Sequence, residues 1–127
     1  MNRILITDDD SMMLRMAGFI VKKAGHEAVT ASSGDECLLK MKETLPQLTV
    51  IDVEMPGKSG IETLEAIRAD SELSGACVCL MTGTLTDEVR KKAEELGALG
   101  CLGKPLAAGE LTDMIMKAET LIGGKRI

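Results

Sequence analysis

The sequence predicts an α/β fold in which a five-stranded parallel sheet carries helices on both faces. Short apolar runs alternate with segments of helical periodicity along the whole chain, as they do in βαβ units. The length of 127 residues suits one domain. Four of the five apolar runs end on an acid, a hydroxyl or a lysine. Because the ends of parallel strands share one edge of a sheet, where ligands bind, we expect these residues to form a site.

The apolar runs are the predicted strands, and they cover residues 4–7, 27–31, 48–51, 77–81 and 101–103. Their apolar character favours parallel strands buried on both faces. The predicted helices cover residues 11–23, 34–43, 60–68, 87–96 and 109–121. Ser33 and Ser59 each precede a Glu by three residues, which is the pattern of a capping box. Thr86 is the predicted cap of the fourth helix, and Gly97 its end.

This pattern assigns residues 1–122 to one domain, and residues 123–127 to a C-terminal tail or the start of a linker. With one Phe, no Trp or Tyr and nine Met, the core must be aliphatic and rich in methionine. We therefore expect Met12, Met13 and Met16 of the first helix to lie in that core rather than on a binding surface.

Composition also limits the partners. A net charge of −5 argues against nucleic acid, which requires a basic face. No apolar stretch approaches the length of a membrane span, and the N-terminal run is too short for a signal peptide, so we expect a cytoplasmic location without membrane contact. No CxxC pair is present, so we expect free thiols in a reducing compartment, most of them buried in strands; the cysteines are Cys37, Cys77, Cys79 and Cys101.

Three aspartates follow predicted strands that would lie side by side: Asp8 and Asp9 after the first, Asp52 after the third. Carboxylates this close raise one another's pKa, and a divalent cation relieves the repulsion. Mg²⁺ suits such a site best because it binds through one or two carboxylates and phosphate oxygens. An aspartate can attack phosphorus to give an aspartyl phosphate. We predict that Asp10 is a helix cap rather than a ligand.

The other two strand ends supply groups that stabilise negative charge. The Thr82 hydroxyl, the Gly83 backbone N–H and the Lys104 ammonium could each neutralise part of the charge on a phosphoryl group in transfer. Pro105 forces Lys104 out of the helical region, and the peptide bond between them is a candidate for the cis form.

These motifs together resemble the receiver domain of two-component response regulators, with a likeness to chemotaxis regulators, over nearly the whole chain. The matching segments are residues 4–11, residues 50–57 followed by Ser59 and Gly60, residues 80–83, and residues 103–105. Each motif alone is common, but their order and spacing are typical of the family. The resemblance implies a flavodoxin-like (βα)5 fold with a doubly wound parallel sheet in the order 2-1-3-4-5.

By this resemblance, Asp52 accepts a phosphoryl group from a histidine kinase or a histidine phosphotransfer protein. Asp8, Asp9, Asp52 and the backbone carbonyl of Glu54 would hold Mg²⁺, with Mn²⁺ as the alternative ion. Thr82, Gly83 and Lys104 would stabilise the phosphoryl group and switch the domain. The module would catalyse only its own phosphorylation and dephosphorylation, and would act on a downstream protein or a covalently linked output domain.

The chain departs from the family pattern at two positions. Cys101 stands where many receivers carry an aromatic residue that moves with the threonine. Glu54 stands where others often carry a neutral polar side chain, and we predict that it tunes the lifetime of the phosphoryl group. We expect output to travel through the face formed by residues 87–96, 101–103 and 109–121. Without the aromatic residue, the backbone of the loop and helix in residues 83–97 should carry most of the change, while Cys101 changes little.

Two other functions fit parts of the sequence. Asp8 and Asp10 match the Asp-x-Asp opening of haloacid-dehalogenase-like phosphatases, in which Asp8 would be the nucleophile of a true hydrolase. The chain lacks the cap and the later acid pair of that class. The third alternative is a degenerate receiver that only binds proteins, against which Asp52, Thr82 and Lys104 all argue.

Overall fold

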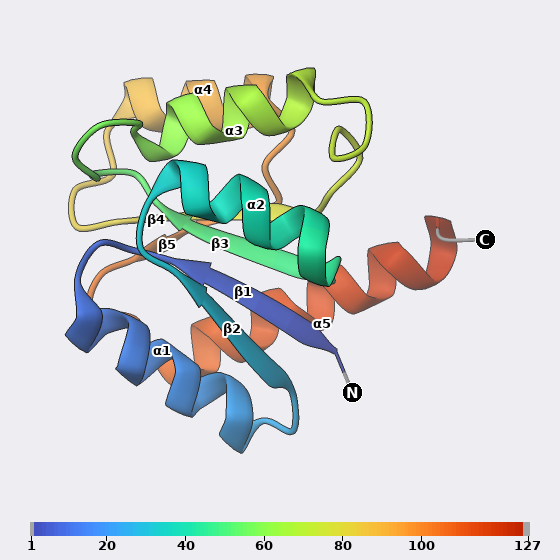
Figure 1. The fold of residues 1–127 in the computed structure, drawn as a ribbon. Coiled ribbons are helices and arrows are strands. Elements are labelled where there is room, and N and C mark those ends of the chain that lie inside the picture. Colours follow the sequence, from blue (N-terminus) through green and yellow to red (C-terminus); the bar gives the residue numbers. More distant parts are fainter. Residues whose placement is uncertain (1, 126–127) are drawn as a thin grey trace.

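The computed structural model describes the backbone of residues 2–125, and the side chains as far as Leu121. A five-stranded sheet lies between two layers of helices (Figure 1), with the strands in the order β2-β1-β3-β4-β5. Neighbouring strands pair in parallel throughout. The predicted fold class is confirmed, including the strand order that the resemblance implied.

The strands lie close to their predicted positions: β1 Arg3–Thr7, β2 Glu27–Ala31, β3 Leu48–Asp52, β4 Val78–Thr82 and β5 Gly100–Gly103. The helices are α1 Ser11–Lys23, α2 Gly34–Thr44, α3 Gly60–Ala69, α4 Asp87–Glu95 and α5 Ala108–Lys125. Since β4 begins at Val78, Cys77 precedes the strand and is only half-buried. No helix of the described chain is both long and apolar enough to cross a lipid bilayer.

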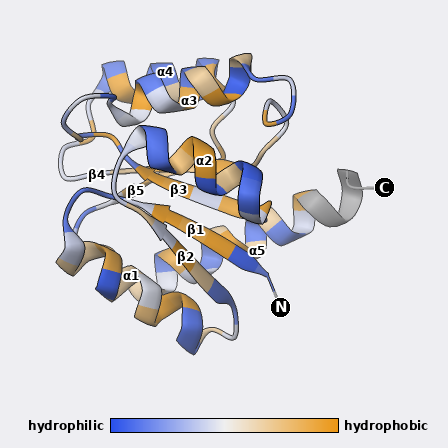
Figure 2. Ribbon diagram, viewed as in Figure 1, coloured by the Kyte–Doolittle hydropathy of each residue, from blue (hydrophilic) through white to orange (hydrophobic). Residues whose placement is uncertain are grey.

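Each face of the sheet has its own core. On one face, Ile4 and Ile6 of β1 pack with side chains of α1 and α5, among them Ala17 and Leu111. On the other, Leu5 packs with side chains of α2, α3 and α4. Figure 2 shows β1 and β3 as largely hydrophobic ribbons between helices of mixed polarity. Burial on both faces explains why the strand sequences are apolar without alternation.

The methionines of α1 correct one prediction. Met13 is buried, as expected, but Met12 is 70% exposed and Met16 is 40% exposed. Two apolar stripes run along this helix, and the one that faces the sheet continues from Met13 through Ala17 and Val21. The sequence could not separate the stripes because both repeat at helical spacing.

Two helix ends also differ from expectation. The Ser33 hydroxyl caps α2, but the Glu36 carboxylate accepts hydrogen bonds from Ser32 instead of from the cap residue, so this capping box is incomplete. Helix α5 continues to Lys125 rather than ending at Leu121, so that Gly123 and Gly124 lie within the helix despite the low helix propensity of glycine. Residues 126 and 127 of the predicted tail lie outside the described range.

Candidate functional site

Three acidic side chains meet at the carboxyl edge of the sheet. Asp52 is the last residue of β3, and Asp8 and Asp9 follow the neighbouring strand β1. One carboxylate oxygen from each lies within 4.8 Å of the others. Asp8 is fully buried and Asp52 is 2% exposed, whereas Asp9 is exposed. The cluster therefore has a buried floor and an opening to solvent.

The chain holds Asp8 in place through its own backbone. The Asp10 N–H donates to Asp8 Oδ1 at 3.0 Å. The Asp10 side chain points the other way and accepts from the N–H groups of Met12 and Met13, so it caps α1 as predicted. The run of three aspartates thus supplies two carboxylates to the cluster and one to the helix.

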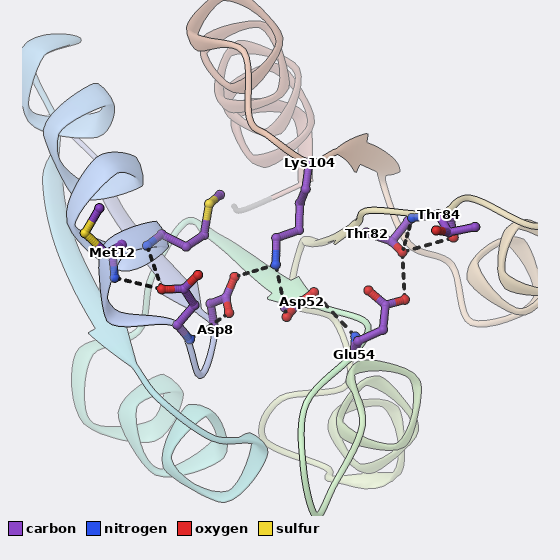
Figure 3. A network of polar contacts seen from close by, with 9 residues as sticks. Asp8, Met12, Asp52, Glu54, Thr82, Thr84 and Lys104 are labelled. Carbon is purple, nitrogen blue, oxygen red and sulfur yellow. Dashed lines mark hydrogen bonds and ion pairs between the residues drawn. The ribbon is translucent and has the colours of Figure 1, made fainter.

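Lys104 reaches the cluster from the end of β5. Its Nζ lies 3.0 Å from Asp8 Oδ2 and 3.3 Å from Asp52 Oδ2, so it bridges the two buried carboxylates (Figure 3). Its backbone N–H donates to the carbonyl of Thr82 at the end of β4. The peptide bond from Lys104 to Pro105, a candidate for the cis form, is cis in the structure.

Charge is unevenly balanced in this cluster. Burial raises the pKa of Asp52, and the nearby Asp8 raises it further, against the opposing effect of Lys104. Burial alone would lower the pKa of Lys104, but its bonds to Asp8 and Asp52 raise it overall. Three carboxyl groups thus face a single ammonium group. A set of hard oxygen donors with more acidic than basic groups, buried at its floor and open to solvent at Asp9, fits a divalent cation such as Mg²⁺ or Mn²⁺.

The next strand adds a hydroxyl, and with it a contact that sequence reasoning missed. Thr82, the last residue of β4, is 2% exposed. Its Oγ1 donates to Glu54 Oε2 at 2.8 Å, and lies 3.1 Å from both the carbonyl and the N–H of Thr84 (Figure 3). The Glu54 N–H in turn approaches Asp52 Oδ1 at 3.4 Å. The pairing of β3 with β4 was the signal that could have located this contact.

Gly60 is a second residue whose role the motifs alone did not reveal. A Cβ atom at this position would lie 2.3 Å from the Asp52 carbonyl oxygen and 2.7 Å from the Val53 Cα. The first residue of α3 therefore packs directly against the backbone beneath Asp52. Only glycine allows this approach, because backbone atoms cannot move aside as a flexible side chain can.

Gly83 and Cys101, two further residues singled out in the sequence, lie in and beside β4 and β5 close to this site. Gly83 follows β4 directly and is exposed. Cys101 in β5 is half-buried and packs against the core beneath α2, α3 and α4. Burial raises the pKa of its thiol, and the charge of Arg90 on α4 partly opposes the change. At the aromatic position of many receivers, this chain thus carries a small, partly covered thiol.

Comparison with known proteins shows the family to which the sequence is similar. Residues 4–116 fit the family model of the response regulator receiver domain. The chain belongs to this family. It is 36% identical over 111 residues to the transcriptional regulatory protein CpxR homolog of Haemophilus influenzae, covering 87% of this chain and 47% of that protein. Its identity to the phosphate regulon regulator PhoB of Escherichia coli is 28% over 113 residues, covering 89% and 49%.

Solved structures agree with the sequence relatives. The chemotaxis protein CheY4 of Vibrio cholerae superimposes with a TM-score of 0.87 at 27% identity, covering 93% of this chain and 98% of that chain. The chain spans about half the length of the two regulators named above. Receiver domains of this family bind Mg²⁺ through acidic residues, and act together with histidine kinases and output domains in two-component signalling.

Proposed function

We propose that this chain is the phosphoacceptor of a two-component system or phosphorelay, and that Asp52 receives the phosphoryl group. The observation that carries the proposal is the setting of Asp52. Its carboxylate is almost fully buried, pairs with Lys104, and lies next to two further aspartates at the carboxyl edge of the sheet. A nucleophile, a fixed cation and a cluster of oxygen ligands for a metal are the parts that phosphoryl transfer requires.

The transfer is an in-line displacement at phosphorus. An Asp52 oxygen forms the new P–O bond while the bond from phosphorus to the imidazole nitrogen of the donor histidine breaks, and the imidazole keeps that electron pair. Lys104 is already within reach of Asp52 and would neutralise charge on the phosphoryl oxygens. The Thr82 hydroxyl and the Gly83 N–H would donate to the same oxygens once the group is in place.

Asp8, Asp9 and Asp52 would hold Mg²⁺, or Mn²⁺ in its place, with the Glu54 backbone carbonyl as the fourth protein ligand. When bound, the cation supplies charge neutralisation for the carboxylates and the incoming phosphate. Loss of any of the three aspartates should weaken both metal binding and phosphorylation. The chain would then act as a signalling module of the cytoplasm rather than as an enzyme that turns over a separate substrate.

The donor would be a histidine kinase or a histidine phosphotransfer protein, and the recipient a downstream protein or a covalently linked output domain. We place the output face on α4, β5 and α5, since Thr82 precedes the loop that leads into α4 and Lys104 ends β5. That assignment predicts that beryllofluoride with Mg²⁺ moves amide signals mainly in residues 83–97 and 100–104. Large shifts confined to α1 and α2 would contradict it.

A hydrolase that uses Asp8 as its nucleophile fits the site less well. Asp8 is fully buried, and both of its carboxylate oxygens are engaged, one by the Asp10 N–H and the other by Lys104. Asp10, the second acid of the Asp-x-Asp pattern, caps α1 instead. A degenerate receiver is also disfavoured, because Asp52, Thr82 and Lys104 are all present at the site.

The test is the intact mass of the protein after incubation with acetyl phosphate and Mg²⁺. We expect one added phosphoryl group, stable to acid and labile to base, that is lost in Asp52→Asn and in the presence of EDTA. Asp113→Asn is the matched control, since it removes an exposed carboxylate on α5 and should be labelled normally. Labelling that persists in Asp52→Asn but disappears in Asp8→Asn would favour the hydrolase.

A further inference from the structure

In the absence of a phosphoryl group, the Thr82 hydroxyl already donates one hydrogen bond and accepts another. It accepts from the Thr84 N–H at 3.1 Å and donates to Glu54 Oε2 at 2.8 Å, the shorter of its two possible donor contacts. A hydroxyl has a single hydrogen, so it can donate to one acceptor at a time. Glu54 therefore holds the one proton that Thr82 could offer to a phosphoryl oxygen on Asp52.

This arrangement joins three elements at one atom. Glu54 belongs to the segment between β3 and α3, Thr82 ends β4, and Thr84 lies in the loop before α4. The charged acceptor makes the bond to Glu54 stronger than a neutral hydrogen bond would be. Glu54 itself is exposed, so its carboxylate can return to water when the bond breaks. The hydrogen bond from Thr82 to Glu54 is thus strong enough to favour one conformation of the loop before α4, yet it can break when a competing acceptor arrives.

We infer that Glu54 is a positioning residue that latches Thr82, and through it the loop before α4, in the unphosphorylated arrangement. This inference rests on the proposed function. Phosphoryl oxygens at neutral pH and the Glu54 carboxylate are both acceptors, so they compete for the same Thr82 proton. Switching requires that the bond from Thr82 to Glu54 is exchanged for one from Thr82 to the phosphoryl group, and Glu54 opposes each such exchange.

Repulsion between the Glu54 carboxylate and the phosphoryl group would also oppose activation, and a double-mutant cycle separates the two effects. The measured quantity is the dissociation constant of beryllofluoride in the presence of Mg²⁺. For Glu54→Ala we expect affinity to increase about fivefold, which corresponds to about 1 kcal/mol. In the background of Thr82→Val, which removes the hydroxyl at nearly constant shape, the latch predicts that Glu54→Ala changes affinity little. An equal gain in both backgrounds would overturn the latch.

Glu54→Gln gives a second discrimination, because its amide oxygen can still accept from Thr82 although the charge is gone. The latch predicts an affinity between those of wild type and Glu54→Ala, whereas an affinity equal to that of Glu54→Ala would overturn it. Glu65→Gln is the matched control: it makes the same change of charge at an exposed position on α3, and should leave affinity unchanged.

The amide signal of Thr84 reports the latch directly, in the absence of beryllofluoride. We expect it to shift in Glu54→Ala and to return towards the wild-type position in Glu54→Gln; no shift in Glu54→Ala would contradict the inference. Failure of the wild-type protein to bind beryllofluoride would instead overturn the proposed function, and the latch with it. If the wild type binds and Glu54→Ala binds no more tightly, only the latch is wrong.

Discussion

Helices α3 and α4 follow the strands that carry Asp52 and Thr82, but the two helices are attached to the sheet in different ways. Helix α3 buries Gly60, Thr63, Leu64 and Ile67, whereas the buried residue of α4 is Ala93. Both bonds of the capping box at Ser59 are present. The strand that ends in Asp52 thus continues into a firmly packed helix, and the strand that ends in Thr82 into a loosely packed one.

Arg68 sharpens this contrast because it ties the two helices together at one end. From α3, its guanidinium donates to the carbonyls of Leu96 and Gly97, just past the end of α4, and to those of Ser74 and Ala76. Helix α4 is therefore pinned at its carboxyl end by Arg68, whereas the loop before its first turn is held through the bonds of Thr82. Motion of its first turn about this anchor is the change that a shift of Thr82 would most easily produce.

The largest effect is expected from Gly60→Ala. The new Cβ would press on the Asp52 carbonyl oxygen from 2.3 Å, and relief requires that α3 or the end of β3 shifts. We expect a loss of about 3 kcal/mol in the free energy of unfolding, as for an overpacked core, together with slower phosphorylation. Urea unfolding and acetyl phosphate labelling measure the two effects. Gly75→Ala is the control, since a Cβ atom added there would have no neighbour within 4 Å; equal stability of the two variants would contradict the rigid role of α3.

Arg68→Ala should have the second-largest effect, a loss of about 2 kcal/mol in the free energy of unfolding, because several carbonyls lose a charged hydrogen-bond donor. Arg68→Lys should rescue little, since an ammonium lacks the forked geometry of guanidinium. Hydrogen exchange should accelerate most around Leu96 and Gly97. Exchange that rises equally over α3 and α4 would show that Arg68 supports the whole domain rather than the end of α4.

The sequence predicted most of this architecture because its signals are local and mutually consistent. The apolar runs, the cap at Ser59 and the acids at the strand ends each follow from short patterns, and their order along the chain implies one edge of one sheet. The structure showed what patterns cannot contain: which of two apolar stripes on α1 faces inward, and which partner a carboxylate selects. Glu36 bonds to Ser32 rather than to its own cap residue, and Glu54 bonds to Thr82 across two strands. Such choices depend on side-chain reach in three dimensions.

The N-terminal caps of α3 and α4 should affect different quantities, one the global free energy of unfolding and the other the local opening of a helix. Ser59→Ala removes a cap from the packed helix, and should lower the global free energy of unfolding by about 1 kcal/mol. Thr86→Ala also removes a cap, since the Thr86 hydroxyl accepts from the Val89 N–H, but it should mainly increase local opening of α4. Urea unfolding and native-state hydrogen exchange distinguish the two. If Thr86→Ala lowers global stability as much as Ser59→Ala does, α4 is not the looser helix.

The smallest effect concerns the thiols of the packed interior. Burial raises the pKa of Cys37 to about 11 and that of Cys79 to about 12, from an ordinary value of 9.0. A thiol whose folded pKa is raised stabilises the fold fully below the unfolded pKa, and that stabilisation is lost as pH rises through the folded value. Between pH 8 and pH 9, each thiol should cost a few tenths of a kcal/mol of stability as the unfolded chain begins to ionise.

Cys79→Val should reduce this alkaline loss, because it removes one of the thiols with a raised pKa while filling similar space in β4. The measurement is the difference between the free energies of unfolding in urea at pH 8 and at pH 9, compared between wild type and variant.

In the native protein at pH 8, an alkylating reagent should also modify the half-buried Cys101, beneath α4, faster than Cys37 or Cys79. Equal modification rates would mean that the surroundings of Cys101 open no more easily than those of Cys37 and Cys79, which would contradict a loosely packed α4.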